Sequence, residues 1–204
     1  MRHLQKTRMR RQELQQQEMT LSAAEAIEAL IVSKESTVGI KEDIVALARQ
    51  EEMLQFSKFD EAQAWALGNH MRDQAILQKL PLVIDIQVAG RKLFFVALPG
   101  TSPDNAEWVE RKINVVMRYH KSSYRVGREL LERGMVLDES RGVNPIAMAA
   151  AGGGFPITIK NLGVVGTVTV SGIPQRNDHQ FVAACIADHL GIAQKEIQLP
   201  PETP

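Results

Sequence analysis

Two pairs of β-rich runs constrain the fold of this 204-residue chain more than any other feature. Each pair surrounds a short glycine-containing turn: 82–88 with 92–98, and 155–160 with 164–171. Runs of β-branched and aromatic residues on both sides of such a turn are typical of antiparallel hairpins. Because 92–98 is apolar on both faces, we expect this strand to be central in the sheet and covered on both sides.

Helical patterns surround the two hairpins. Apolar residues recur with a helical period in five segments: 22–33, 41–53, 60–80, 103–133 and 178–190. Asp60 and Asp178 are suited to cap the third and the last of these helices. Ser102 followed by Pro103 opens the long fourth helix, which we expect to continue to a stop at Gly134.

The order of these elements predicts an α+β fold. Helices, a hairpin, a long helix, a second hairpin and a last helix predict a mainly antiparallel sheet flanked by helices. A brief run near 56–59 brings the expected number of strands to about five. We expect three regions: a basic, helical N-terminal extension at 1–40, the α+β domain at 41–195, and a proline-rich tail at 196–204.

Composition excludes several classes of protein. The chain has 24 basic and 24 acidic residues, so no nucleic-acid-binding charge extends over the whole molecule. The bases among residues 1–12 are typical of a solvated tail, and we expect no nucleic-acid partner. The single cysteine, Cys185, excludes an internal disulfide and fits a reducing compartment. No apolar stretch is long enough for a signal or a membrane span, which favours a cytoplasmic protein without a membrane partner.

The histidines and glycines give weak signals for chemistry. No histidine or cysteine spacing is typical of a metal site, so we expect no metal. His120 and His179 are candidates for haem ligation or acid/base work, with a surface or hydrogen-bonding role as the alternative. The run Gly152-Gly153-Gly154 leads into a strand and not into a helix, which argues against a phosphate loop. It favours close approach of the backbone to a neighbour or a ligand.

A basic and aromatic cluster on the long helix is the better candidate for binding. Arg111 and Arg118 are seven residues apart and share a face, while Lys112 lies about 100° round the helix. Together with Trp108 and Tyr124, these residues are suited to hold a carboxylate. The alternative is a solvated helix face.

Two long segments resemble a known family. The segment "GGGFPITIKNLGVVGTVTVSGIPQRNDHQFV" and the upstream "LPLVIDIQVAGRKLFFVALPGTSPDNAEWVERKINVVMRYHKSSY" resemble the GlcG/HbpS-like haem-degrading family. The details "ALPGTSPDN" and "SSY" are closest to a subfamily found in bacteria and fungi. The resemblance covers roughly residues 43–191 and leaves the first 40 outside it.

The resemblance implies a profilin-like sheet covered by helices, assembly into homo-oligomers such as octamers, and binding of haem, another tetrapyrrole or a small organic acid. Relatives have histidine directly before Ser-Ser-Tyr, whereas this chain has Lys121 there and His120 one position earlier. A shift of one residue turns a helical side chain by about 100°, so the histidine role does not carry over directly.

We therefore expect first a small-ligand-binding protein, second a structural or adaptor protein, and third an enzyme with a histidine acid/base. The candidate ligand-binding residues are Trp108, Arg111, Lys112, Arg118, His120, Ser122, Ser123, Tyr124, Gly152, Gly153, Gly154, Asp178 and His179.

Overall fold

The computed structural model describes residues 39–201, of which Ile40–Pro201 form one compact unit. The helix expected at 22–33 and the basic arm lie outside the described residues. The unit contains these helices and strands in chain order: α2 (Ile40–Met53), α3 (Glu61–Leu77), β1 (Val83–Val88), β2 (Arg91–Ala97), α4 (Pro103–Tyr119), α5 (Ser123–Glu132), β3 (Gly154–Ile159), β4 (Gly163–Ser171) and α6 (Gln175–Leu190), with short 3₁₀ turns η1 (Glu139–Arg141), η2 (Pro145–Ala147) and η3 (Gln194–Glu196). None of the described helices is long and apolar enough to cross a membrane.

The sheet has four strands in the order β2-β1-β4-β3, all paired antiparallel. Both predicted hairpins are confirmed, and β1 and β4 join them at the centre of the sheet, where Val83 pairs with Ser171. The expected fifth strand reduces to a single parallel bridge between Phe56 and Ile159. The α+β class is therefore confirmed, with one strand fewer than expected.

The prediction that residues 92–98 form a central strand is wrong, because β2 lies at the edge of the sheet. Its two faces are apolar for different reasons. Phe94 is buried and lies edge-on to Trp65 of α3, with the ring centroids 5.8 Å apart. Phe95 remains 46% exposed, and the ammonium of Lys92 lies over its ring at 4.6 Å. An apolar run on both faces therefore marks an edge strand here.

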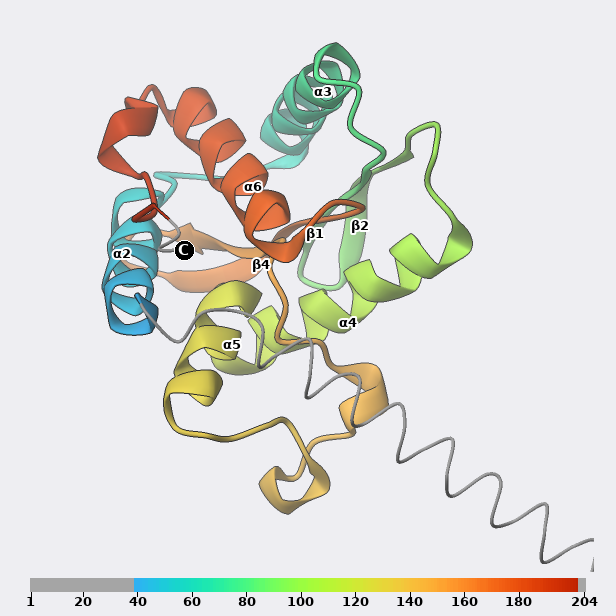
Figure 1. The fold of residues 1–204 in the computed structure, drawn as a ribbon. Coiled ribbons are helices and arrows are strands. Elements are labelled where there is room, and N and C mark those ends of the chain that lie inside the picture. The colour runs from blue at the N-terminus through green and yellow to red at the C-terminus, as the bar shows by residue number, and fades with distance from the viewer. Residues whose placement is uncertain (1–38, 202–204) are drawn as a thin grey trace, which may run out of the picture. The chain divides into compact units, whose positions relative to one another are not determined.

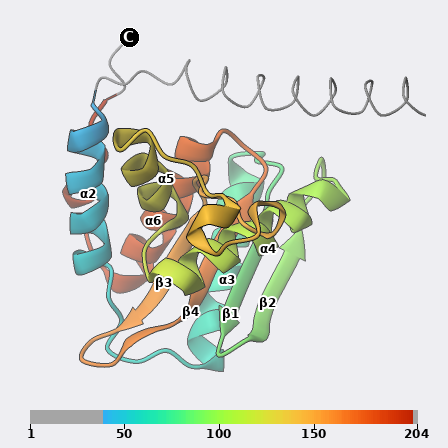
Figure 2. The same cartoon turned by 90° about the horizontal axis from the view of Figure 1, so that it is seen from below.

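Helices cover the two faces of the sheet differently (Figures 1 and 2). The main apolar core lies beneath α3 and α6 and includes Ile84 and Ile86 of β1 and Val168 and Val170 of β4. On the opposite face α4 crosses the sheet, as Figure 2 shows, and Val83 packs against its side chains. Helix α2 stands beside α5 in both views.

The long helix predicted at 103–133 is two helices. The structure begins it as expected, with Ser102 and Asn105 forming a capping box. Helix α4 ends at Tyr119, and the next residue, His120, caps it with a left-handed backbone at φ of 53°. Ser122 then caps α5, because its side chain accepts a hydrogen bond from the backbone N–H of Arg125 at 3.3 Å. Because apolar residues recur with a helical period on both sides of this break, the sequence pattern predicted one continuous helix.

Helix α6 begins at Gln175 after Pro174, so the prediction that Asp178 caps it is wrong. Asp178 lies in its first turn, where its carboxylate accepts a hydrogen bond from the backbone N–H of Ile173 at 3.2 Å. The helix ends at Leu190, and Gly191 caps it with a left-handed φ of 70°.

Candidate functional site

The outer side of α4 carries a stacked tryptophan–arginine pair. The guanidinium of Arg111 lies 4.5 Å from the centre of the Trp108 ring, within the range of a cation–π contact. Arg111 Nε is buried and has no hydrogen-bond partner among residues 39–201. Arg118 lies two turns further along α4, exposed and beside Gly142. This surface therefore presents two guanidinium groups and one large aromatic ring.

The segment before β3 runs along the same side of α4. The backbone N–H of Ala149 donates to the carbonyl of Arg111 at 3.1 Å, and Asn114 Nδ2 donates to the carbonyl of Ala147 at 2.9 Å. These bonds hold residues 147–149 against the helix. Ile146, in the same segment, is 82% exposed, so an apolar side chain stands next to the basic surface.

Lys112 points into the protein, away from this surface. Its ammonium donates to the Asp178 carboxylate at 2.8 Å and to the carbonyl of Val170 at 3.0 Å. Both side chains are at most 3% exposed. Burial lowers the pKa of Lys112 and raises that of Asp178, while their mutual attraction opposes both shifts. The pair fastens α4 to β4 and α6.

The three glycines lie where other chain segments come too close for a side chain. A Cβ at Gly152 would overlap the carbonyl oxygen of Gln175, and one at Gly153 would overlap that of Val170. Gly153 also has φ of 118°. The backbone N–H of Gly154 donates to Ser123 Oγ at 2.9 Å. These contacts match the close-approach interpretation of the glycine run.

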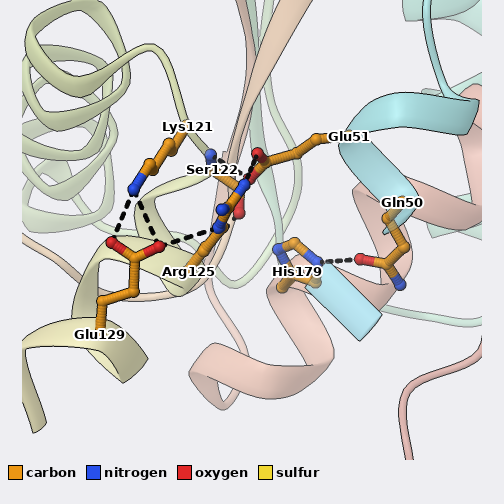
Figure 3. Close-up of polar contacts among 7 residues, drawn as sticks. All are labelled: Gln50, Glu51, Lys121, Ser122, Arg125, Glu129 and His179. Carbon is orange, nitrogen blue, oxygen red and sulfur yellow. Dashed lines mark hydrogen bonds and ion pairs between the residues drawn. The ribbon is translucent and has the colours of Figure 1, made fainter. Parts of the chain in front are cut away.

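Charged side chains join α2 to the start of α5 (Figure 3). Glu51 of α2 accepts from the backbone N–H of Ser122 at 2.8 Å and from Arg125 at 2.7 Å. Glu129 accepts from Arg125 at 2.9 Å and from Lys121 at 2.7 Å. Burial raises the pKa of Glu51. Burial acts in the same direction on Glu129, but Lys121 and Arg125 outweigh it and lower the pKa of that carboxyl.

His179 is fully buried beside this cluster, as the close-up shows (Figure 3). Its Nε2 lies 2.7 Å from Gln50 Oε1, and its ring is 5.3 Å from that of Tyr124. Burial, with a smaller contribution from Arg176, lowers the pKa of His179 to about 3. The imidazole is therefore neutral near pH 7 and is not poised to exchange protons at that pH.

A second buried cluster was not foreseen from the sequence. Asp43 of α2 lies 3.0 Å from Arg128 and 2.8 Å from Arg176, and Arg176 also donates to the Tyr124 hydroxyl at 3.4 Å. The available signal was the spacing of Asp43, Leu47 and Gln50, which places these residues on one face of α2. Polar residues on a helix face normally predict that the face is exposed, whereas Asp43 and Gln50 are buried.

The structure thus divides the thirteen candidate residues into three groups. Trp108, Arg111 and Arg118 share the outer side of α4, and His120 is exposed at the corner between α4 and α5. The other nine are buried in the contacts described above: Lys112, Ser122, Ser123, Tyr124, Gly152, Gly153, Gly154, Asp178 and His179. Among the described residues, no group of three or more histidine, cysteine or acidic side chains is arranged to hold a metal ion.

Comparison with known proteins agrees with the resemblance seen in the sequence. Residues 59–187 match the family described as "Haem degrading protein HbpS-like". The chain belongs to this HbpS-like family. A UPF0303 protein of Acidobacterium capsulatum is 47% identical over 163 residues, covering 80% of this chain and 99% of the relative. A UPF0303 protein of Serratia proteamaculans is 44% identical over 156 residues, covering 76% of this chain and 97% of the relative.

Solved structures share the HbpS-like fold. The Ybr137w protein superposes with a TM-score of 0.68 at 23% identity, covering 80% of this chain and 97% of that one. HbpS itself gives 0.53 at 19% identity, covering 67% and 93%. The PduOC structure, a complex with heme, gives 0.54 at 17% identity, covering 63% and 93%. At these identities the likeness shows the fold alone.

Proposed function

We propose that this HbpS-like protein binds a small ligand that carries carboxylate groups, a tetrapyrrole such as haem or a small organic acid. The site is the outer side of α4, with Trp108, Arg111 and Arg118. The observation that carries the proposal is the Arg111 guanidinium, whose Cζ lies over the Trp108 ring 4.5 Å from its centre, with a buried Nε that donates to no group of residues 39–201. Buried polar groups of native proteins normally have hydrogen-bond partners, so this atom is suited to a ligand oxygen.

The residues present fit the edge of a tetrapyrrole. Arg111 and Arg118 are seven residues apart, which corresponds to about 10.5 Å along the helix axis. Each guanidinium is suited to pair with one carboxylate, while Trp108 and Ile146 offer apolar surface to a flat ring. A bound haem would supply its iron chemistry; the protein's part is to hold the carboxylates and to orient the ring.

We further propose that the protein acts as a homo-oligomer in the cytoplasm. The second candidate function, a structural or adaptor role, rests on the large apolar side chains that α3 and β2 expose. Trp65 is 63% exposed, Leu77 75% and Phe95 46%. Apolar surface of this kind is suited to contact another chain. An enzyme that uses His179 receives no support, because its imidazole is neutral, fully buried and hydrogen-bonded to Gln50.

Titration with haemin and with citrate tests the binding proposal. We expect a Soret shift on adding haemin to the wild-type protein at micromolar concentration, and weaker binding of both ligands by the Arg111→Ala and Trp108→Ala variants. Loss of one charge-assisted hydrogen bond corresponds to about 1.5–3 kcal/mol, or roughly a 10- to 150-fold weaker affinity. Arg49→Ala, which removes an exposed arginine from α2, is the matched control and should bind as the wild type does.

Two outcomes contradict the proposal in different ways. No Soret shift with the wild type excludes haem and leaves the small acids, which calorimetry with citrate tests separately. Unchanged affinity of the Arg111→Ala variant for every ligand that binds excludes the site on α4.

A further inference from the structure

The sheet face beneath α4 contains a row of buried polar side chains. Asp85 on β1 is the direct cross-strand partner of Thr169 on β4, and Thr167 lies two residues before Thr169 on the same face. All three are fully buried. Val83, on the same face of β1, packs against Val109 and Ile113 of α4, so this helix covers the row.

Three oxygen atoms of this row lack a polar partner. Asp85 Oδ1 and both threonine hydroxyls form no hydrogen bond with any group of residues 39–201, whereas Asp85 Oδ2 pairs with the ammonium of Lys92. A buried polar atom left unpaired is costly, and native proteins satisfy nearly all such atoms with protein, water or a ligand. Three of them on neighbouring positions of one sheet face therefore point to a common occupant.

The charges near the row indicate what kind of occupant fits. Lys92 of β2 lies 2.8 Å from Asp85 Oδ2 and 3.2 Å from Glu110 Oε1 of α4. Two carboxylates and one ammonium leave a formal charge of minus one. The unpaired atoms are all oxygens, which are the ligands that hard metal cations prefer. Divalent sites in proteins normally use more carboxylates than the single one buried here.

We propose that Asp85, Thr167 and Thr169 form a binding site for a monovalent metal cation of the sodium or potassium type. The ion contacts the carboxylate and both hydroxyls and bridges β1 and β4 at the centre of the sheet. Lys92 stands at the rim, where its side chain is 43% exposed and Glu110 holds it. Bound there, the cation brings the local charge to zero and supplies a partner for oxygens that the protein leaves unpaired.

This site is distinct from the proposed ligand surface on the outer side of α4. The cation site lies between the helix and the sheet, whereas Arg111 and Trp108 stack on the side of α4 that faces residues 147–149. The two proposals therefore succeed or fail separately.

Thermal unfolding in different chloride salts tests the cation site. Wild-type protein is unfolded in sodium chloride, potassium chloride and choline chloride at equal ionic strength, since choline is too large to enter. We expect a Tm several degrees higher with sodium or potassium than with choline, rising with the logarithm of salt concentration as for any ligand that binds the folded state alone. Line broadening in the sodium NMR spectrum on adding protein gives a second readout.

The double variant Thr167→Val and Thr169→Val removes both hydroxyls and keeps the shape of the side chains. We expect it to lose the difference between salts, and in choline to be at least as stable as the wild type, because unpaired hydroxyls no longer lie buried. Thr158→Val, at a half-buried position of β3, is the matched control and should keep the difference. Asp85→Asn should lose the difference as well, and the threonine pair decides the matter if that variant does not fold.

Equal Tm values for the wild type in all three salts would overturn the proposal and assign the three oxygens to bound water. A salt difference that survives the double threonine variant would also overturn it, since the ion would then bind elsewhere.

Discussion

The buried imidazole of His179 makes the stability of the fold depend on pH in a calculable way. The side chain is fully buried, and the pKa falls from its usual 6.5 to about 3, first because of burial and second because of Arg176. The folded state therefore binds this proton less readily than the unfolded state does. The stability that the group contributes is complete above pH 6.5, declines as the pH falls toward about 3, and is constant below that value.

The magnitude follows from the linkage between protonation and folding. Each pH unit below 6.5 removes roughly 1.4 kcal/mol from the free energy of unfolding, because only the unfolded state takes up the proton. Between about pH 7 and about pH 5, His179 alone thus accounts for a loss of about 2 kcal/mol. The His179→Gln variant keeps an amide group beside Gln50 but has no proton to take up in this range.

Urea denaturation of the wild type and of His179→Gln at both pH values measures the difference. All other titrating groups are common to the two proteins, so they cancel when the two pH dependences are subtracted. We expect the wild type to lose about 2 kcal/mol more than the variant on acidification. His120→Gln, which changes an exposed histidine, should follow the wild type. If His179→Gln loses as much stability as the wild type, the imidazole is not the neutral buried group described here.

Two further sets of substitutions test the contacts around the glycine run. Lys112→Met leaves the Asp178 carboxylate buried without its ammonium and should lower the free energy of unfolding by about 3–5 kcal/mol, whereas adding Asp178→Asn to it should recover part of the loss. Equal losses for the single and double variants in urea denaturation would contradict that account. Gly153→Ala should prevent accumulation of soluble folded protein, because its Cβ meets the carbonyl of Val170 at a φ of 118°. Gly163→Ala, with a φ of 108° and no atom within 4 Å of its Cβ, should cost only about 1–3 kcal/mol and remain soluble, as circular dichroism and gel filtration will show.

Local signals in the sequence predicted the hairpins well, because pairing across a short turn depends only on residues close in the chain. The place of β2 at the edge was not predictable in that way. Which neighbours a strand receives is decided by distant segments, and here β1 takes β4 as its second partner. Both faces of β2 carry an apolar side chain although the strand lies at the edge. Phe94 packs on α3, and the ammonium of Lys92 lies over the ring of Phe95 on the other face.

The sequence identified the basic residues of the candidate site but not which of them are exposed, because exposure also depends on distant segments. Arg111 and Lys112 are adjacent in sequence and both basic, yet about 100° on the helix places one outside and the other in a buried ion pair. The helical period identifies a face but not which face meets the sheet. Asp85, Thr167 and Thr169 alternate with apolar residues, a pattern that predicts a solvent-facing side of a sheet. Helix α4 covers that side, and only the folded structure shows it.

The central pairing of β1 with β4 also sets the order of events during synthesis of the chain. Each hairpin closes over a short loop, whereas the pairing of Val83 with Ser171 closes most of the domain into one large loop. Such distant contacts make folding slow, because the entropy of loop closure is lost before they form. The first hairpin leaves the ribosome long before β4 and α6 exist, so β1 lacks its second partner strand and Ile84 and Ile86 lack the helix that later packs on them. The nascent chain is therefore most vulnerable to aggregation in the interval between β2 and β4, and a pause in translation within that interval would lengthen the exposure.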